Sequence, residues 1–399
     1  MKFIGFIGWG IGTVVTMAVA KNPFRPAFGI VPQVWAGRQA ILDSYMAALD
    51  SFPGDQGRTL VISGLRGIGK TALVTELEEI ASQAGWIPIR VHTTDRNPVE
   101  TLVSSTIANK IHQIDPPAGR RITGATIAGL GGITTEQTQT QQPQPTLNSS
   151  LRELSDLLAL HGTGIVISID EVQHIDPEEM AIIATAYQDL IRDGVDISLV
   201  VAGLSHGVDS LLHHPGTTFI RRGVRVELQP LSHQESVDTL IITAAKSGIA
   251  FSQPAAEAAA AFAKGHPYLV QLTGSLAWGQ AKRAGKDHID VEEVDAINHV
   301  AINSLGTQVH QPELKYLTRS ETQFIEAMAA VMDENSQAEL SAIAQRLGKQ
   351  VTSLSDVRAR LLIKEVVAAT AWGKLSFRLP YFKEYLESSQ SNYPFKNFS

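Results

Sequence analysis

Residues 64–71 of this 399-residue chain read GLRGIGKT and directly follow the apolar run TLVIS at residues 59–63. They fit the pattern G-x-x-x-x-G-K-[ST] in the context that gives it physical meaning: a buried strand, a glycine-rich turn and then a helix. The glycines let the backbone turn where a Cβ atom would clash, so loop N–H groups and the positive end of the helix face an anion. The sequence therefore predicts a loop that binds the phosphates of a nucleoside triphosphate.

The whole loop is expected to contact the nucleotide, and two of its residues have additional predicted roles. Lys70 is predicted to reach the β- and γ-phosphates and to act in catalysis, and the Thr71 hydroxyl is predicted to ligate Mg²⁺. The predicted ATP-binding residues of the loop are Gly64, Leu65, Arg66, Gly67, Ile68, Gly69, Lys70 and Thr71.

Strands and helices alternate over the first 230 residues. Apolar runs predict strands at 59–63, 86–92, 164–169, 197–202 and 224–228. Helical spacing of apolar residues predicts helices at 71–84, 99–114, 147–160 and 180–191. Continuous apolar strands joined by helices are typical of a doubly wound parallel sheet, so we expect an α/β P-loop NTPase domain over residues 22–230.

The remaining segments differ from this pattern. Residues 116–145 hold too few apolar side chains to build a core and predict a flexible insertion. Residues 231–312 read as an all-α lid. Helices predicted at 320–332, 338–347 and 353–362, followed by strand-like runs at 366–371 and 375–379, outline a C-terminal winged-helix domain over residues 316–390, with a tail at 391–399.

Composition limits the class of protein. With 44% hydrophobic and 18% charged residues the chain suits a globular protein, and its length favours two or three domains. The net charge of -7 argues against general electrostatic binding of nucleic acid but leaves room for a local basic patch. The absence of cysteine excludes disulfides and cysteine-ligated zinc, and it is consistent with a cytoplasmic location.

Residues 3–20 contain no charged side chain. A membrane anchor, a start codon placed too early and a packed apolar segment all remain open as interpretations of residues 1–21. An anchor would make the protein membrane-associated. A cleaved secretory signal fits poorly, because export would separate an ATP-binding protein from its ATP.

Asp170 and Glu171 follow the apolar strand predicted at 164–169. An NTPase needs one carboxylate to hold Mg²⁺ and a second to deprotonate the attacking water. Asp170 suits the first role and Glu171 the second, whereas a solvated acidic turn is the alternative. The pair favours hydrolysis over a P-loop kinase, which need not activate water.

Four segments together resemble the AAA+ and STAND group of P-loop ATPases: GLRGIGKT, ISIDE at 167–171, FIRR at 219–222 and GHP at 265–267. The resemblance is closest to bacterial ATP-binding proteins related to origin-recognition and initiator ATPases, and it extends from about residue 22 to the end, including a winged helix after the ATPase.

The resemblance implies further site residues. Gly37 and Arg38, within VWAGR at 34–38, would lie beside the adenine, and so would Pro267. Arg221 and Arg222 would be arginine fingers, although a solvated arginine pair is the alternative. Pro267 could instead simply begin a helix. The chain departs from the family at its sensor strand, where the polar residue is displaced to Ser205.

Two functions follow. In the first, ATP binding and Mg²⁺-dependent hydrolysis act as a conformational switch that controls engagement of DNA or a protein by the winged helix. Arg358, Arg360 and Lys364 would then be available to DNA, and an arginine acting in trans would imply a homo-oligomer. In the second, the chain is a nucleotide-stabilised adaptor with incidental turnover.

Overall fold

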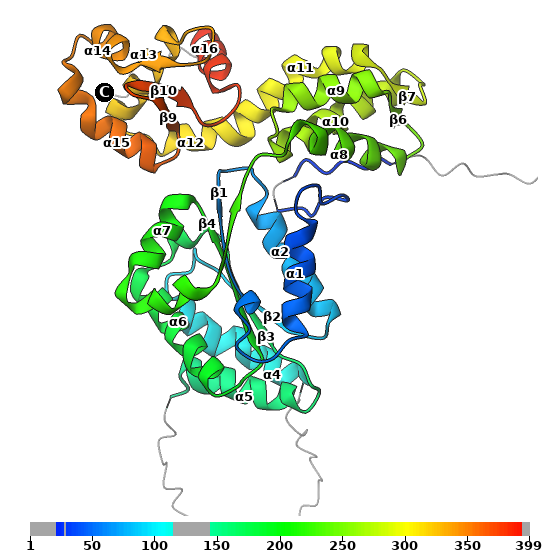
Figure 1. Ribbon diagram of the computed structural model, residues 1–399, viewed down its shortest axis with the longest axis vertical. Coiled ribbons are helices and arrows are strands. Elements are labelled where there is room, and N and C mark those ends of the chain that lie inside the picture. Colours follow the sequence, from blue (N-terminus) through cyan, green and yellow to red (C-terminus); the bar gives the residue numbers. More distant parts are fainter. Residues whose placement is uncertain (1–20, 28, 115–143, 393–399) are drawn as a thin grey trace, which may run out of the picture.

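The computed structural model describes residues 21–27, 29–114 and 144–392. The N-terminal apolar segment, nearly all of the insertion predicted at 116–145 and the last residues of the tail lie outside these ranges. Within them, a sheet domain carries helices on both faces, and two smaller groups of elements lie next to each other on one side of it (Figure 1). No helix of the described residues is long and apolar enough to cross a membrane.

The sheet domain is built on five parallel strands in the order β2-β3-β4-β1-β5. These are β1(Thr59–Gly64), β2(Ile87–Val91), β3(Ile165–Ile169), β4(Ile197–Gly203) and β5(Val224–Leu228). All residues of β3 and β4 are buried, because helices cover both faces of the sheet and leave no place for polar alternation. All five predicted strands are confirmed, and so is the parallel α/β fold class.

Alternate residues of each strand pack against different helices. Ile62 of β1 joins the core formed with α1(Gln39–Leu49) and α2(Lys70–Gln83). Val61 joins the opposite core, formed with α5(Leu147–Ala159) and α6(Pro177–Arg192). The remaining elements of this part are η1(Gln56–Arg58), α3(Pro98–Thr101), η2(Leu102–Ile107), α4(Ala108–Ile114), η3(Val172–His174), α7(Ser205–His213) and η4(Pro215–Arg222).

The next segment is wholly helical apart from one small strand pair. It consists of α8(His233–Ala245), β6(Ala250–Phe251), α9(Gln253–Ala263), α10(Pro267–Arg283), β7(His288–Ile289) and α11(Val291–Leu305). Phe24, far earlier in the chain, packs on Gly274 of α10, so closely that a Cβ atom there would lie 2.3 Å from its ring. The N-terminal segment therefore lies against this helical lid before the chain enters the sheet domain.

The C-terminal part combines helices with a three-stranded antiparallel sheet in the order β8-β10-β9. Its elements are η5(Gly306–His310), α12(Gln311–Lys315), α13(Arg319–Val331), β8(Ala338–Glu339), α14(Leu340–Leu347), η6(Val351–Leu354), α15(Ser355–Ile363), β9(Val367–Ala371), β10(Lys374–Phe377) and α16(Phe382–Asn392). Three helices and a hairpin in this order are consistent with the predicted winged helix.

One continuous apolar core joins the lid to the C-terminal part. Leu269 of α10, Leu305 of α11 and Phe324 of α13 belong to the same buried cluster. The path between them, from α11 through η5 to α12, keeps right-handed helical backbone angles where these elements meet. The two groups of helices that Figure 1 shows side by side are thus packed together as one body.

Candidate functional site

The predicted phosphate loop connects the C-terminal end of β1 to the N-terminus of α2. Gly69 has φ +99° and is the residue that precedes the helix, a conformation that side-chain-bearing residues rarely adopt. Gly67 has φ +73°, and a Cβ atom on it would lie 2.5 Å from the ring of His266. The loop can therefore keep this shape only with glycine at these positions.

Lys70 is buried at the start of α2. Its Nζ donates hydrogen bonds to the carbonyl oxygens of Gly64 (2.9 Å) and Leu65 (3.0 Å), which hold the ammonium group within the loop. Burial lowers the pKa of Lys70, and the carboxylates of Glu171 and Asp170 act in the opposite direction. A cation is thus held where the loop and both carboxylates meet.

Thr71 and Asp170 lie together although 99 residues separate them. The Thr71 hydroxyl donates to Asp170 Oδ2 at 2.6 Å, and the backbone N–H of Glu171 donates to Oδ1 at 2.9 Å. Burial raises the pKa of Asp170, and the hydrogen bond from Thr71 opposes this effect. A hydroxyl and a carboxylate oxygen side by side are a ligand pair that suits Mg²⁺, which usually takes its other ligands from phosphates and water.

Glu171 lines the cavity next to this pair. Its backbone is left-handed, with φ 54° and ψ 47°, an uncommon conformation for a residue with a side chain. Gln173 donates a hydrogen bond from its side-chain amide to the Glu171 carboxylate. The carboxylate is therefore held in place by a neighbour rather than left free in solvent.

A cavity of about 340 Å³ opens from the loop. Most of its lining comes from three separate parts of the chain: the loop with α2, the N-terminal segment that contains Trp35, and α10 with Tyr268 and Gln271. Gln271 accepts a hydrogen bond from the backbone N–H of Arg25 (3.0 Å), which ties the second wall to the third. A mostly apolar wall facing a phosphate-binding loop is the shape that a nucleotide requires.

Most of the residues predicted to bind the nucleotide line this cavity. They are Arg38, Arg66, Gly67, Ile68, Gly69, Lys70, Thr71 and Pro267, joined by Glu171. Gly64, Leu65 and Gly37 do not line it; Gly37 instead packs against the side chain of Glu235. Pro267 also occupies the first position of α10. Its position is therefore compatible with both interpretations, a place beside the nucleotide and the start of a helix.

Arg221 and Arg222 lie away from the cavity of their own chain. They end η4, just before β5, whose Val224 pairs with Leu60 near the start of β1. The phosphate loop follows the other end of β1, about 13 Å along the strand. The guanidinium of Arg221 donates to the carbonyl of Leu212. Within one chain the structure does not bring these arginines to the site.

Sequence reasoning missed two contacts that reach the phosphate loop from the lid and the C-terminal part. The buried His266 ring lies against Gly67, with its Nε2 atom 3.2 Å from the carbonyl oxygen of Arg66, and burial lowers the pKa of His266 to about 4. Arg66 forms an ion pair with Glu313 of α12. Both partners lie some 200 residues or more from the loop, so no local pattern indicates them.

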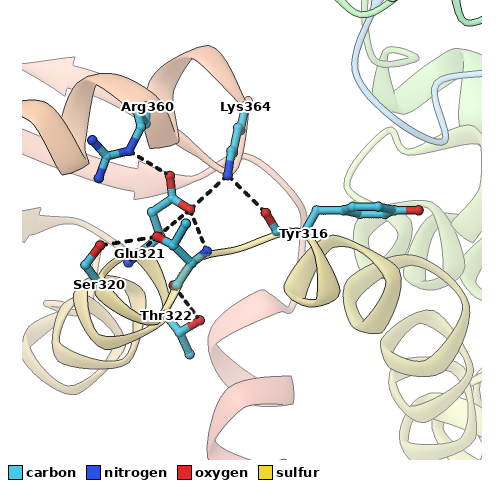
Figure 2. A network of polar contacts seen from close by, with 7 residues as sticks. Tyr316, Ser320, Glu321, Thr322, Arg360 and Lys364 are labelled. Carbon is cyan, nitrogen blue, oxygen red and sulfur yellow. Dashed lines mark hydrogen bonds and ion pairs between the residues drawn. The ribbon is translucent and has the colours of Figure 1, made fainter. Parts of the chain in front are cut away.

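Two of the cations expected to be available to DNA are engaged elsewhere. Arg360 Nε and Lys364 Nζ donate to the buried carboxylate of Glu321, at 3.1 and 2.8 Å (Figure 2). Burial acts to raise the pKa of Glu321, but hydrogen bonds from Lys364, Thr318 and Arg360 outweigh it and lower the pKa to about 2. Arg360 and Lys364 therefore hold α15 against α13, which corrects the expectation that they are free for DNA.

The third of these cations, Arg358, is half-buried. The Nε atom of Arg358 is buried without a hydrogen-bond partner among the described residues. Residues 316–392 hold about as many acidic as basic side chains. The described C-terminal part therefore carries no excess of positive charge.

The parallel sheet, the glycine loop at the end of β1 and the acidic pair at the end of β3 define a P-loop nucleoside triphosphatase. Residues 34–201 match the family model of the AAA ATPase domain, so this part of the chain is an AAA+ P-loop ATPase domain. Residues 307–386 match the model of a domain of unknown function, DUF8462. A search of curated proteins found no match.

Solved structures share the fold. The structure of the ORC2 protein of Aeropyrum pernix with ADPNP and ADP matches with a TM-score of 0.62 at 16% identity, over 92% of this chain and 97% of that one. The ADP form of the same protein matches with a TM-score of 0.52 at 17% identity, over 92% and 96% of the two chains. The similarity therefore extends beyond the sheet domain to the helices that follow it.

Proposed function

We propose that this chain binds ATP with Mg²⁺ in the 340 Å³ cavity, hydrolyses it, and transmits its nucleotide state to the C-terminal domain. The observation that carries the proposal is the ion pair between Arg66 of the phosphate loop and Glu313 of α12. A loop that changes its contacts when phosphates bind would change this pair too, and α12 leads directly into the C-terminal domain.

The residues of the site divide the chemistry between them. Lys70 would bind the β- and γ-phosphates, and Thr71 and Asp170 would hold Mg²⁺, which neutralises phosphate charge when bound. Glu171 would take a proton from a water whose oxygen attacks the γ-phosphorus. The bond from that phosphorus to the β,γ-bridging oxygen then breaks, and ADP leaves. The close contact of Gly67 with His266 and the positive φ of Gly69 would keep the loop N–H groups in position.

The same proposal divides the chain into an ATPase domain over residues 22–230, a lid over 231–312 and a winged helix over 316–390. Arg221 and Arg222 would act on the site of a neighbouring copy, since they lie far from their own. The output would be engagement of a protein or of DNA by the C-terminal domain. The ion pairs at Glu321 and the balanced charge of this domain favour a protein.

Phosphate release from Mg·ATP by purified protein tests the proposal. Lys70→Ala is expected to lose nucleotide binding, and Glu171→Gln to keep binding while turnover falls by about 100-fold or more. Equal turnover in Glu171→Gln and the parent chain would contradict the assigned base. Stimulation by DNA would identify nucleic acid as the partner, whereas its absence would support a protein.

An adaptor stabilised by nucleotide is the second candidate. It is favoured by the cavity lining, most of which comes from three parts of the chain that a bound nucleotide would hold together. In that case Lys70→Ala should lower the melting temperature and abolish function, and Glu171→Gln should leave the function in cells intact.

A further inference from the structure

The end of β4 lacks the polar side chain that the resemblance leads one to expect, and a side chain from η3, the short helix after β3, takes its place. β4 ends at Gly203, Leu204 follows, and Ser205 already belongs to α7. Ser205 does not line the cavity. The side chain that fills this position is Gln173, which lies two residues after Glu171.

Two hydrogen bonds fix Gln173. Its amide nitrogen donates to the Glu171 carboxylate, and its amide oxygen accepts from the backbone N–H of Leu204 at 3.2 Å. The first bond fixes the orientation of the amide, because only the –NH₂ end donates, and the second uses the remaining oxygen. Gln173 thus links Glu171 to the backbone at the end of β4.

Two glycines make room for this link. A Cβ atom on Gly203 would lie 2.8 Å from the amide oxygen of Gln173, and one on Gly207 would lie 2.5 Å from its Cβ atom. Both distances are shorter than those that real Cβ atoms keep from neighbouring atoms. The junction of β4 and α7 is therefore shaped around the Gln173 side chain.

The backbone at Glu171 also points to a functional constraint. Left-handed backbone angles at a residue with a side chain cost free energy and persist only where surrounding contacts impose them. Here the constraint turns the carboxylate toward Gln173 at the edge of the cavity. Strain of this kind at a carboxylate beside a phosphate loop fits a group whose direction matters.

We propose that Gln173 is a positioning residue for hydrolysis: it orients the Glu171 carboxylate toward the attacking water without touching the nucleotide. This inference rests on the proposed function, since it assumes that Glu171 acts as the base. An orienting partner that leaves binding untouched alters the rate of the chemical step rather than the affinity for the substrate.

Two substitutions at Gln173 separate positioning from packing. Gln173→Leu keeps most of the side-chain volume and loses both hydrogen bonds. Gln173→Glu keeps the oxygen that accepts from Leu204 but replaces the donor to Glu171 with a second carboxylate. We expect kcat to fall by about 10- to 100-fold in Gln173→Leu and further in Gln173→Glu, with KM for ATP within about threefold of the parent. His174→Ala, at the exposed neighbouring residue, is the control and should leave kcat unchanged.

A second pair tests the other end of the link. Leu204 has φ -65°, a value that proline adopts without strain. Leu204→Pro therefore removes the N–H donor and leaves the rest of the backbone nearly unchanged. Leu204→Ala loses the same side chain and keeps the N–H. A lower kcat in Leu204→Pro than in Leu204→Ala would support the role of this bond, and equal values would contradict it.

The outcomes distinguish this inference from the proposed function. If the parent chain hydrolyses ATP and Glu171→Gln does not, while Gln173→Leu retains the parent kcat, only the inference fails. A joint loss of kcat, ATP affinity and melting temperature in Gln173→Leu would also overturn it, because that result indicates a structural role. Absence of turnover in the parent chain would overturn both.

Discussion

Arg66, in the middle of the phosphate loop, forms an ion pair with Glu313 on α12, 247 residues further along the chain. Burial acts to lower the pKa of Arg66, but the pairing with Glu313 outweighs it and raises that pKa. The contact connects the loop that would hold phosphates to the segment that leads into the C-terminal domain. Figure 1 shows α12 beside the C-terminal part of the chain.

Removing either partner should weaken this connection. The Arg66 side chain is 36% exposed and that of Glu313 is 16% exposed, so a double-mutant cycle with Arg66→Ala and Glu313→Ala should give a coupling of about 1 kcal/mol or less in the free energy of unfolding. Hydrogen exchange adds a second readout. ATP should change the protection of residues 311–315 in the parent chain, and this change should be absent in Glu313→Ala. Identical ATP responses in the two proteins would exclude Glu313 from the switch.

Stability should fall in mild acid because of two buried histidines. Burial lowers the pKa of His266 to about 4 and that of His310 to about 3, compared with 6.5 for an exposed imidazole. Below pH 6.5 the unfolded chain therefore binds protons that the folded chain does not. Between pH 6.5 and 4 each histidine should lower the free energy of unfolding by up to about 1.4 kcal/mol per pH unit.

Denaturant titrations at several pH values measure this dependence. His310→Leu should flatten the slope between pH 6.5 and 4, because the nonpolar side chain has no proton to gain. Exposed His213 provides the control, and His213→Leu should keep the parent slope. An unchanged slope in His310→Leu would show that this histidine already takes up its proton in the folded chain.

Glu321→Gln should destabilise the C-terminal domain. The substitution removes the charge that accepts hydrogen bonds from Arg360 and Lys364, and charge-assisted bonds of this kind contribute about 1.5–3 kcal/mol. Because the folded pKa of Glu321 is lowered to about 2, this stability is present above about pH 4.5 and is lost as the pH falls toward 2. Thermal unfolding at pH 7 measures the effect, with exposed Glu334→Gln as the control. A melting temperature equal to that of the control would contradict it.

Arg221 and Arg222 should act only between chains. If either is an arginine finger, turnover per molecule should rise with protein concentration, and Arg221→Ala or Arg222→Ala should lower kcat by about 1,000-fold or more. Arg225→Ala, on the neighbouring strand β5, should leave turnover unchanged. Mixing each variant with Lys70→Ala protein should restore activity, because the second chain supplies the missing arginine. Turnover that is independent of concentration in all variants would contradict action in trans.

The sequence predicted the parts of this fold that local patterns determine. The central strands β3 and β4 are buried on both faces, so short apolar runs such as residues 165–169 stand out from the helices around them. The loop glycines and the acidic pair have fixed positions relative to their strands. Strand order, by contrast, depends on which helix crosses which face of the sheet, and no segment of the sequence carries that information by itself.

The contacts that shape the site were the ones that the sequence could not reveal. Phe24 packs into the lid, His266 meets Gly67, and Gln173 replaces a side chain expected on another strand. Each involves a residue of ordinary type whose partner is set by tertiary packing alone. The error at Arg360 and Lys364 has the same origin, since basic residues on a helix look equally available whether or not a buried carboxylate lies behind them.

The length of the helical path from α11 through α12 determines how far a rotation of the lid would move its far end. A helical path from residue 291 to residue 315 has a length of about 37 Å at 1.5 Å per residue. If the lid turned by about 10° around the nucleotide, the far end of such a rod would be displaced by about 6 Å. Both ends of this rod are embedded in a shared apolar core, so the rod would transmit the rotation as a lever. A small tilt beside a phosphate would then become a displacement wide enough to open or close a contact with another molecule.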